Sequence, residues 1–262
     1  MDWIKPHYTK QSELVGVAEI RSSHERIAQQ LHDFIAGQGR ARRLLELGAG
    51  ACGLAAALTR HGYEVVAVEF NPHDIELARK LVGEHGVQGI DVVEADFYEV
   101  ELEGRFDVVY YWDGFGVGED ADQKRLLRRI GTEWLADGGY ALIDVFSPWI
   151  WLKRTGSSYE FRANDGTTWK RRVEFDAVNS RFVDFLSPLD GRPTQLSQTI
   201  RTYSVPEFLL LTEGTGTRVD AIFDPFGEAA VELGRYDAEV SSRVASSNGF
   251  VAKLVPEGSV DR

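Results

Sequence analysis

The chain has 262 residues, 43% of them apolar and 27% charged, which predicts one large α/β domain or a core domain with an insertion. The formal net charge of −12 disfavours a nucleic-acid partner, because binding phosphates broadly needs a basic surface. The single cysteine, Cys52, excludes an intrachain disulfide framework and a cysteine-rich zinc site.

Targeting and metal signals are weak in this sequence. The first ten residues, MDWIKPHYTK, contain no apolar segment of the signal-peptide kind, and no stretch approaches the ~20 apolar residues of a membrane span. His61, His73 and His85 form no cluster with ligand spacing, so we expect no metal site. We therefore expect a cytoplasmic protein without a membrane partner.

The predicted elements begin with helical structure over residues 11–36, broken near 21–23, where apolar side chains recur every three or four positions. Short apolar strands then alternate with helices. The expected strands are 43–47, 64–69, 90–94, 106–112 and 140–146, and the expected helices are 53–61, 73–85 and 120–135. This alternation indicates a parallel sheet with both faces covered, in which the carboxyl ends of the strands share one edge where ligands bind.

The pattern changes after residue 146. Short alternating stretches, separated by the turn sequences NDG, VNS and PLDG, predict a small antiparallel sheet within residues 147–203. A helix is expected over 204–211, where Ser204 and Glu207 form a capping box. Residues 218–223 and 250–254 are the last two expected strands.

Residues 44–53 read LLELGAGACG, in which Gly48, Gly50 and Gly53 have the G-x-G-x-x-G spacing of a nucleotide-binding turn. Glycines allow a sharp turn and let a cofactor approach the main chain without a Cβ between them. An acid, Glu46, precedes the first glycine by two positions. A carboxylate there would repel the phosphates of a dinucleotide, but it suits the sulfonium and ammonium groups of S-adenosylmethionine.

Acids also end the next two strands. Glu69 can accept hydrogen bonds from ribose hydroxyls under either hypothesis. Asp96 can accept a hydrogen bond from an adenine amine, while the adjacent Phe97 covers the base.

The segments ELGAGACG, VVAVEFN and EADFYEV resemble the first three motifs of class I S-adenosylmethionine-dependent methyltransferases, and YYWDGFGVGED resembles the region after the fourth strand of that family. The resemblance covers roughly residues 40–146. It implies a Rossmann-like α/β fold, with a seven-stranded, mostly parallel sheet, helices on both faces and an antiparallel β insertion after strand five. The residues that it implies for cofactor binding are Tyr8, Glu46, Gly48, Ala49, Gly50, Glu69, Phe70, Asn71, Asp96, Phe97 and Trp112.

We divide the chain into an N-terminal helical lid at 1–36, a cofactor-binding core at 37–146 and 204–255, and a substrate-covering insertion at 147–203. His7 and Tyr8 could fold over the cofactor and exclude water, and Asp113 leaves the fourth strand at the active edge. These three are the candidate catalytic residues. Lid packing is the alternative for His7 and Tyr8, and a solvated strand end is the alternative for Asp113.

The insertion carries five aromatic residues that either wall an acceptor pocket or form its own core: Trp149, Trp151, Tyr159, Phe161 and Trp169. A basic group near residues 153–154 and 170–172 either binds an anionic substrate group or is a solvated strand face.

We predict an enzyme that moves a methyl group from S-adenosylmethionine to a nitrogen or oxygen of a small molecule, such as a natural product or other secondary metabolite. Chains could pair as a homodimer through the inserted strands. Three alternatives stay open: an enzyme of the same fold that catalyses a non-methylating reaction such as cyclisation, an NAD-dependent oxidoreductase, and a nucleic-acid or protein methyltransferase. The net charge disfavours a nucleic-acid substrate.

If Glu69 binds the ribose, Glu69→Ala should weaken binding of S-adenosylhomocysteine by about tenfold or more, because a hydrogen-bonded carboxylate is lost. Titration calorimetry measures this change. Unaltered binding by the variant would contradict the ribose assignment.

Overall fold

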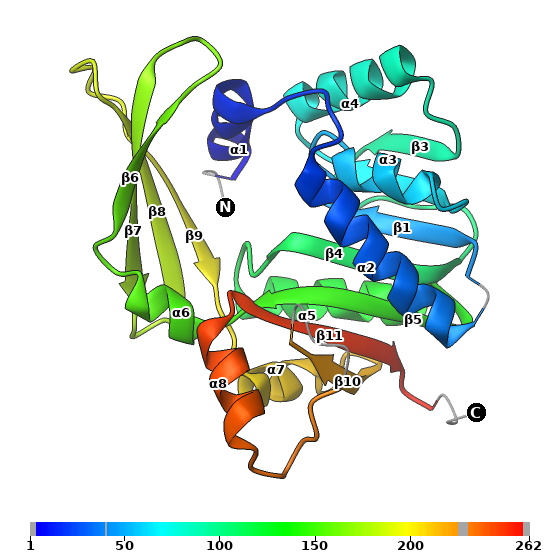
Figure 1. Cartoon of the computed structure of the whole chain (residues 1–262). Helices are drawn as coiled ribbons and strands as arrows, with labels where there is room; N and C mark the ends of the chain where they lie inside the picture. Colours follow the sequence, from blue (N-terminus) through cyan, green and yellow to red (C-terminus); the bar gives the residue numbers. More distant parts are fainter. Residues whose placement is uncertain (1–3, 40, 225–229, 259–262) are drawn as a thin grey trace.

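The computed structural model describes residues 4–39, 41–224 and 230–258, so residues 1–3 of the predicted lid lie outside the described part of the chain. One sheet has seven strands in the order β10-β11-β5-β4-β1-β2-β3 (Figure 1). Its strands are β1 (Arg43–Leu47), β2 (Glu64–Glu69), β3 (Ile90–Glu94), β4 (Phe106–Phe115), β5 (Leu135–Phe146), β10 (Thr217–Phe223) and β11 (Gly249–Pro256). Strands β1 to β5 pair in parallel, and β11 runs antiparallel to both β5 and β10. The predicted mostly parallel sheet is confirmed.

Helices cover both faces of this sheet. One face packs against α2 (Ser22–Gln38), α3 (Gly53–Thr59) and α4 (Pro72–His85), and the other against α5 (Asp120–Arg129) and α7 (Val205–Thr212). Alternation along β1 sends Leu44 toward the first face, and Leu45 and Leu47 toward the second. Glu46 therefore shares its face with Leu44, beneath α2 and α3, which is an unusual place for a charge.

A second, antiparallel sheet follows β5 in the chain. Its strands are β6 (Ser158–Arg162), β7 (Thr168–Asp176), β8 (Arg181–Pro188) and β9 (Leu196–Arg201), in that order. Helix α6 (Pro148–Lys153) leads into it, and an isolated bridge between Val117 and Ile200 ties β9 to the segment that follows β4. The predicted antiparallel insertion is confirmed.

Helix α1 (Ile4–Val15) lies between the two sheets (Figure 1). Its Leu14 packs with Trp169 and Leu186 of the antiparallel sheet, while its Ser12 hydroxyl donates to Asp74 of α4 at 2.5 Å. In contrast, α2 packs on α3 within the core of the large sheet. We therefore propose that the lid consists of α1 and that α2 is a layer of the core.

Several predicted boundaries were wrong. Helix α1 begins at Ile4, well before residue 11, because its buried side chains include His7 and Ser12 and so give no apolar stripe. The helix expected to reach residue 135 ends at Arg129, and a π-helical turn (Ile130–Trp134) connects it to β5, which starts five residues earlier than expected. The sequence analysis missed α6 and α8 (Ala238–Ser246), since α6 has six residues and α8 buries none.

Within the described residues, every helix is too short or too polar to cross a membrane.

Gly249→Ala should lower the free energy of unfolding by about 1–3 kcal/mol, because a Cβ there would overlap the carbonyl oxygen of Val145 on the neighbouring strand. Gly83 is a matched control, since nothing lies within 4 Å of a Cβ at this exposed position of α4. Gly83→Ala should raise stability by up to about 1 kcal/mol. Urea unfolding measures both, and equal effects would contradict this packing.

Candidate functional site

The glycine turn after β1 is held against the end of β2. Gly48 and Gly50 both have left-handed backbone angles, with φ of 63° and 53°. The Gly50 N–H donates to the Glu69 carboxylate at 2.9 Å, and the Ala49 N–H donates to the Val68 carbonyl at 3.1 Å. The turn is therefore a fixed cradle of main-chain atoms, open on the side of the Gly50 Cα.

Glu69 is buried at the end of β2 and organises two loops at once. Besides Gly50, the main-chain N–H groups of Phe70 and Asn71 donate to its carboxylate, each at 2.8 Å. Burial raises its pKa above the ordinary value, although these hydrogen bonds favour the ionised form. Oε1 accepts the hydrogen bonds from Phe70 and Asn71, whereas Oε2 accepts only the one from Gly50 and can accept another, so a role in ribose binding stays open to Glu69.

Glu46 is only 4% exposed, and its carboxylate lies beside the buried Tyr110 hydroxyl, but its Oε2 atom makes no well-aligned hydrogen bond with the described residues. Burial raises its pKa to about 8. A buried carboxylate oxygen without a partner is costly unless a ligand satisfies it. Glu46 thus fits the positively charged methionine end of the predicted cofactor.

The third predicted acid lies beside the other two along the sheet edge. Asp96 follows β3, and the Ala95 N–H just before it donates to the Glu69 main-chain carbonyl at 2.9 Å. The Asp96 carboxylate accepts from the Tyr98 N–H at 2.9 Å, which ends the strand in a turn. Phe97 is buried, with its ring 5.5 Å from that of Tyr111.

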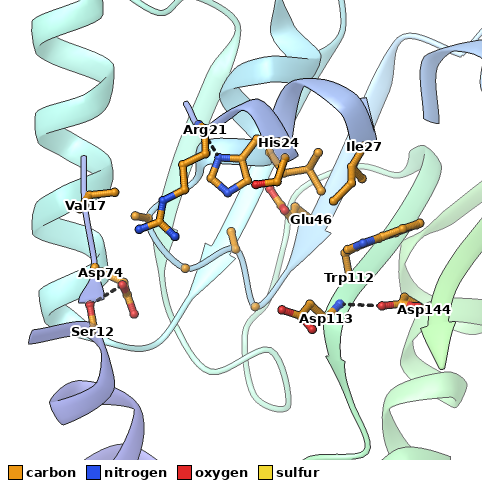
Figure 2. A pocket seen from close by; sticks show the side chains of 18 of the residues that line it. Ser12, Val17, Arg21, His24, Ile27, Glu46, Asp74, Trp112, Asp113 and Asp144 are labelled. Atoms are coloured by element: carbon orange, nitrogen blue, oxygen red, sulfur yellow. Dashed lines mark hydrogen bonds between the residues drawn. The ribbon is translucent and has the colours of Figure 1, made fainter. Parts of the chain in front are cut away.

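A cavity of about 590 Å³ opens next to this edge, between α1, α2, the glycine turn and the ends of β4 and β5 (Figure 2). We call it the central cavity. The predicted site residues that line it are Tyr8, Glu46, Gly48, Ala49, Gly50, Trp112 and Asp113. Those outside its lining are His7, Glu69, Phe70, Asn71, Asp96 and Phe97.

Helix α1 is fastened over the β2–α4 loop beside the cavity. The Asn71 side chain donates to the Tyr8 carbonyl and accepts from the Thr9 hydroxyl, both at 3.2 Å. The Tyr8 ring meets the Phe70 ring edge-on at 6.4 Å. His7 is buried, and this burial lowers its pKa, so that a neutral imidazole is favoured.

Two groups at the cavity were missed by the sequence analysis. The first is the start of α2, where Arg21 and His24 point into the cavity (Figure 2). The Arg21 guanidinium donates to the Val15 carbonyl at 3.0 Å, and the His24 ring occupies the space that a side chain at Gly53 would need. The third glycine of the motif therefore admits α2 close to the turn. The helix break that the sequence predicts at 21–23 was the signal that could have identified Arg21 and His24 as cavity residues.

The second missed group is Asp144 of β5, which forms a pair with Asp113 of β4. The Asp113 N–H donates to the Asp144 carboxylate at 3.2 Å, and Asp113 has a left-handed backbone with φ of 57° (Figure 2). Asp113 is exposed to solvent where it lines the cavity, and partial desolvation by the residues around it raises its pKa to about 6. Desolvation, together with the charge of Asp113, raises the pKa of Asp144 to about 7.

Comparison with known proteins adds a match to a domain family. Residues 44–139 match a family model described as "Methyltransferase domain". No curated protein matches this sequence.

Among solved structures, the CcbJ methyltransferase of Streptomyces caelestis is similar, with 21% identity, a TM-score of 0.69 and coverage of 87% of this chain and 89% of that one. An S-adenosylmethionine-dependent methyltransferase of Clostridium acetobutylicum has 13% identity, a TM-score of 0.71 and coverage of 90% and 92%. The sugar N-methyltransferase KedS8 of a Streptoalloteichus species has 18% identity, a TM-score of 0.63 and coverage of 87% and 86%. At these identities, the likeness shows a shared fold.

The raised pKa of Glu46 predicts a pH-dependent stability difference between the wild type and Glu46→Gln. The folded protein keeps a proton on Glu46 that the unfolded chain releases above its ordinary pKa of 4.5, so this group's stabilisation is lost as pH rises toward about 8. Glutamine does not titrate. The variant should therefore gain stability relative to wild type between about pH 4.5 and about pH 8, measured by urea unfolding of the free protein. Asp91→Asn, at an exposed position of β3, is the control, and a constant difference for Glu46→Gln would contradict the burial.

Proposed function

Because this chain carries a class I S-adenosylmethionine-dependent methyltransferase domain, we propose that it transfers a methyl group to an amine nitrogen of a small molecule, such as a natural product or other secondary metabolite. The observation that carries the choice of nitrogen is the pair of carboxylates, Asp113 and Asp144, in the central cavity.

The residues around the glycine turn would hold the cofactor. The carboxylate of Glu46 would accept hydrogen bonds from the ammonium of the methionine part, and Glu69 would accept from the ribose. Asp96, with Phe70 and Phe97, would surround the adenine near the end of β3, the outermost strand on this side of the large sheet. The guanidinium of Arg21, which also lines the cavity, has the charge to bind the methionine carboxylate. Residues Tyr8, Ala49, Asn71 and Trp112 complete this proposed cradle.

When bound, S-adenosylmethionine supplies an electrophilic methyl group on a sulfonium centre. The chain's own task is then to place the acceptor in line with that group and to exclude water. Helix α1 would help to place the acceptor and to exclude water, because its hydrogen bonds to the β2–α4 loop keep it over the cavity.

The charge of the cavity favours an amine over a hydroxyl. A hydroxyl benefits from a base that removes its proton during attack, whereas an amine can release its proton after the new bond has formed. Asp113 and Asp144, with pKa values raised to about 6 and 7, can attract an ammonium group and accept one of its protons near neutral pH, which frees the nitrogen lone pair for attack on the methyl group. The second proton leaves after the new bond has formed. His7, another candidate catalytic residue, lies outside the lining of the cavity, and we assign it to the packing of α1. The sugar N-methyltransferase of similar fold supports the choice of nitrogen.

Asp113→Asn tests the acid pair with little risk to the fold, since asparagine adopts the left-handed backbone readily. We expect kcat/KM for amine acceptors to fall by about 100-fold or more, with the affinity for S-adenosylhomocysteine unchanged. In the wild type, kcat/KM should rise with pH through about 6 to 7, as the two carboxylates lose their protons.

Transfer of labelled methyl groups to a panel of small amines measures these rates, and Asp91→Asn is the control. Label that appears on hydroxyl compounds but on no amine would overturn the choice of nitrogen.

A further inference from the structure

The antiparallel sheet presents a mostly apolar face to α1 and α6, and one polar row crosses it. In each of β7, β8 and β9, the residues two positions before and two positions after the polar residue are apolar. One of the two packs in the apolar cluster around Phe146, and the other packs in the apolar cluster around Leu14. In β8, for example, Asp184 lies between Phe182, which packs with Phe146, and Leu186, which packs with Leu14 of α1. The four members of this row, one from each strand, are Tyr159, Arg171, Asp184 and Gln198.

The row is joined by hydrogen bonds. Arg171 donates to both oxygens of Asp184, with Nε at 2.8 Å from Oδ1, and Gln198 Nε2 donates to Asp184 Oδ2 at 2.9 Å. Arg171 also donates to the Tyr159 hydroxyl at 2.9 Å. Asp184 is 1% exposed, and burying such a charge pair gives little net stability compared with apolar side chains of similar size. Stability alone therefore gives no reason for a polar row at this place.

Gln198 offers an observation that points to a ligand. It is 7% exposed, and its Oε1 atom accepts no hydrogen bond from the described residues. An amide oxygen buried in this way is costly unless a bound group donates to it. Arg171 has five N–H groups, of which three are used within the row, so it has donors to spare.

The row lies near the reaction site, because β9 is tied to the segment after β4 by the Val117–Ile200 bridge, although none of the four residues lines the central cavity and Tyr159 is half exposed. The charges of Asp184 and Arg171 act on the pKa values of both Asp113 at the central cavity and His7 of α1. Asp184 likewise helps to raise the pKa of Tyr8, which lines the same cavity. The Arg201 N–H of β9 donates to the Gly116 carbonyl at 2.9 Å, which fixes β9 against the segment that carries Asp113.

We propose that the row of Tyr159, Arg171, Asp184 and Gln198 is the specificity surface for the acceptor, and that it binds hydroxyl groups of a hydroxylated amine. This inference rests on the proposed function. A substrate hydroxyl can donate to Gln198 Oε1 and accept from Arg171, which matches the donors and acceptors that the row leaves open. An anionic acceptor group fits less well, because Asp184 already compensates the charge of Arg171 and two further carboxylates lie nearby.

The test compares a hydroxylated with a hydroxyl-free amine. Binding of D-glucosamine, D-galactosamine and cyclohexylamine to the full chain, in the presence of S-adenosylhomocysteine, is measured by saturation-transfer NMR. The wild type should bind at least one amino sugar about tenfold more tightly than cyclohexylamine.

Two variants and one control then examine the row itself. The ratio of the affinity for the amino sugar to that for cyclohexylamine should fall toward one in Gln198→Met and in Tyr159→Phe, while the affinity for cyclohexylamine stays unchanged. Tyr159 is half exposed, so the Tyr159→Phe variant is expected to fold. Lys170→Ala, which changes the neighbour of Arg171 on the opposite face of β7, should leave the ratio intact. A ratio near one in the wild type, or a ratio unchanged in both variants, would overturn the proposal. Failure of the wild type to bind S-adenosylhomocysteine would instead overturn the proposed function as a whole.

Discussion

The carboxylate of Glu69 is the group on which the geometry of this site depends. It accepts main-chain N–H groups from the glycine turn after β1 and from the loop after β2, so one buried charge fixes two loops from neighbouring strands. Hydrogen bonds to an ionised group are about twice as strong as neutral ones, and burial strengthens them further. The same loop carries Asn71, which holds α1, so the position of the proposed lid also follows from this carboxylate.

Charges of both signs line the central cavity. Three acids come from strand ends, with Glu46 on β1, Asp113 on β4 and Asp144 on β5, and Asp74 comes from α4, whereas Arg21 immediately precedes α2. A parallel sheet gathers its carboxyl ends on one edge, which brings the strand-end acids to the same cavity. This mixture of charges suits a ligand with both a carboxylate and cationic groups. The region next to Asp113 and Asp144 is negative, and the proposed amine would bind there.

The sequence predicted the large sheet well, because β1, β2 and β3 are apolar runs whose ends are marked by glycine, Asn71-Pro72 and Asp96. The three acids could be placed on one edge for the same reason. Elements that bury few apolar side chains were missed or misplaced, as α1 and α8 show. Arg171 illustrates a different difficulty: in the sequence it belongs to a basic group with Lys170 and Arg172, and only alternation within a paired strand separates it from them.

The sequence by itself determined the order of strands and helices, the glycine turn and the acids of the cofactor edge, since these depend on local periodicity and on residues a few positions apart. Only the tertiary structure decided that Asp144 lies beside Asp113, that Arg21 and Glu46 line the same cavity, and that Gln198 and Asp184 form one row with Arg171. These contacts join segments 13 or more residues apart, and their geometry is set by strand register and by the packing of α1 and α2. No local pattern encodes such distances, because they result from how the two sheets and their helices pack together.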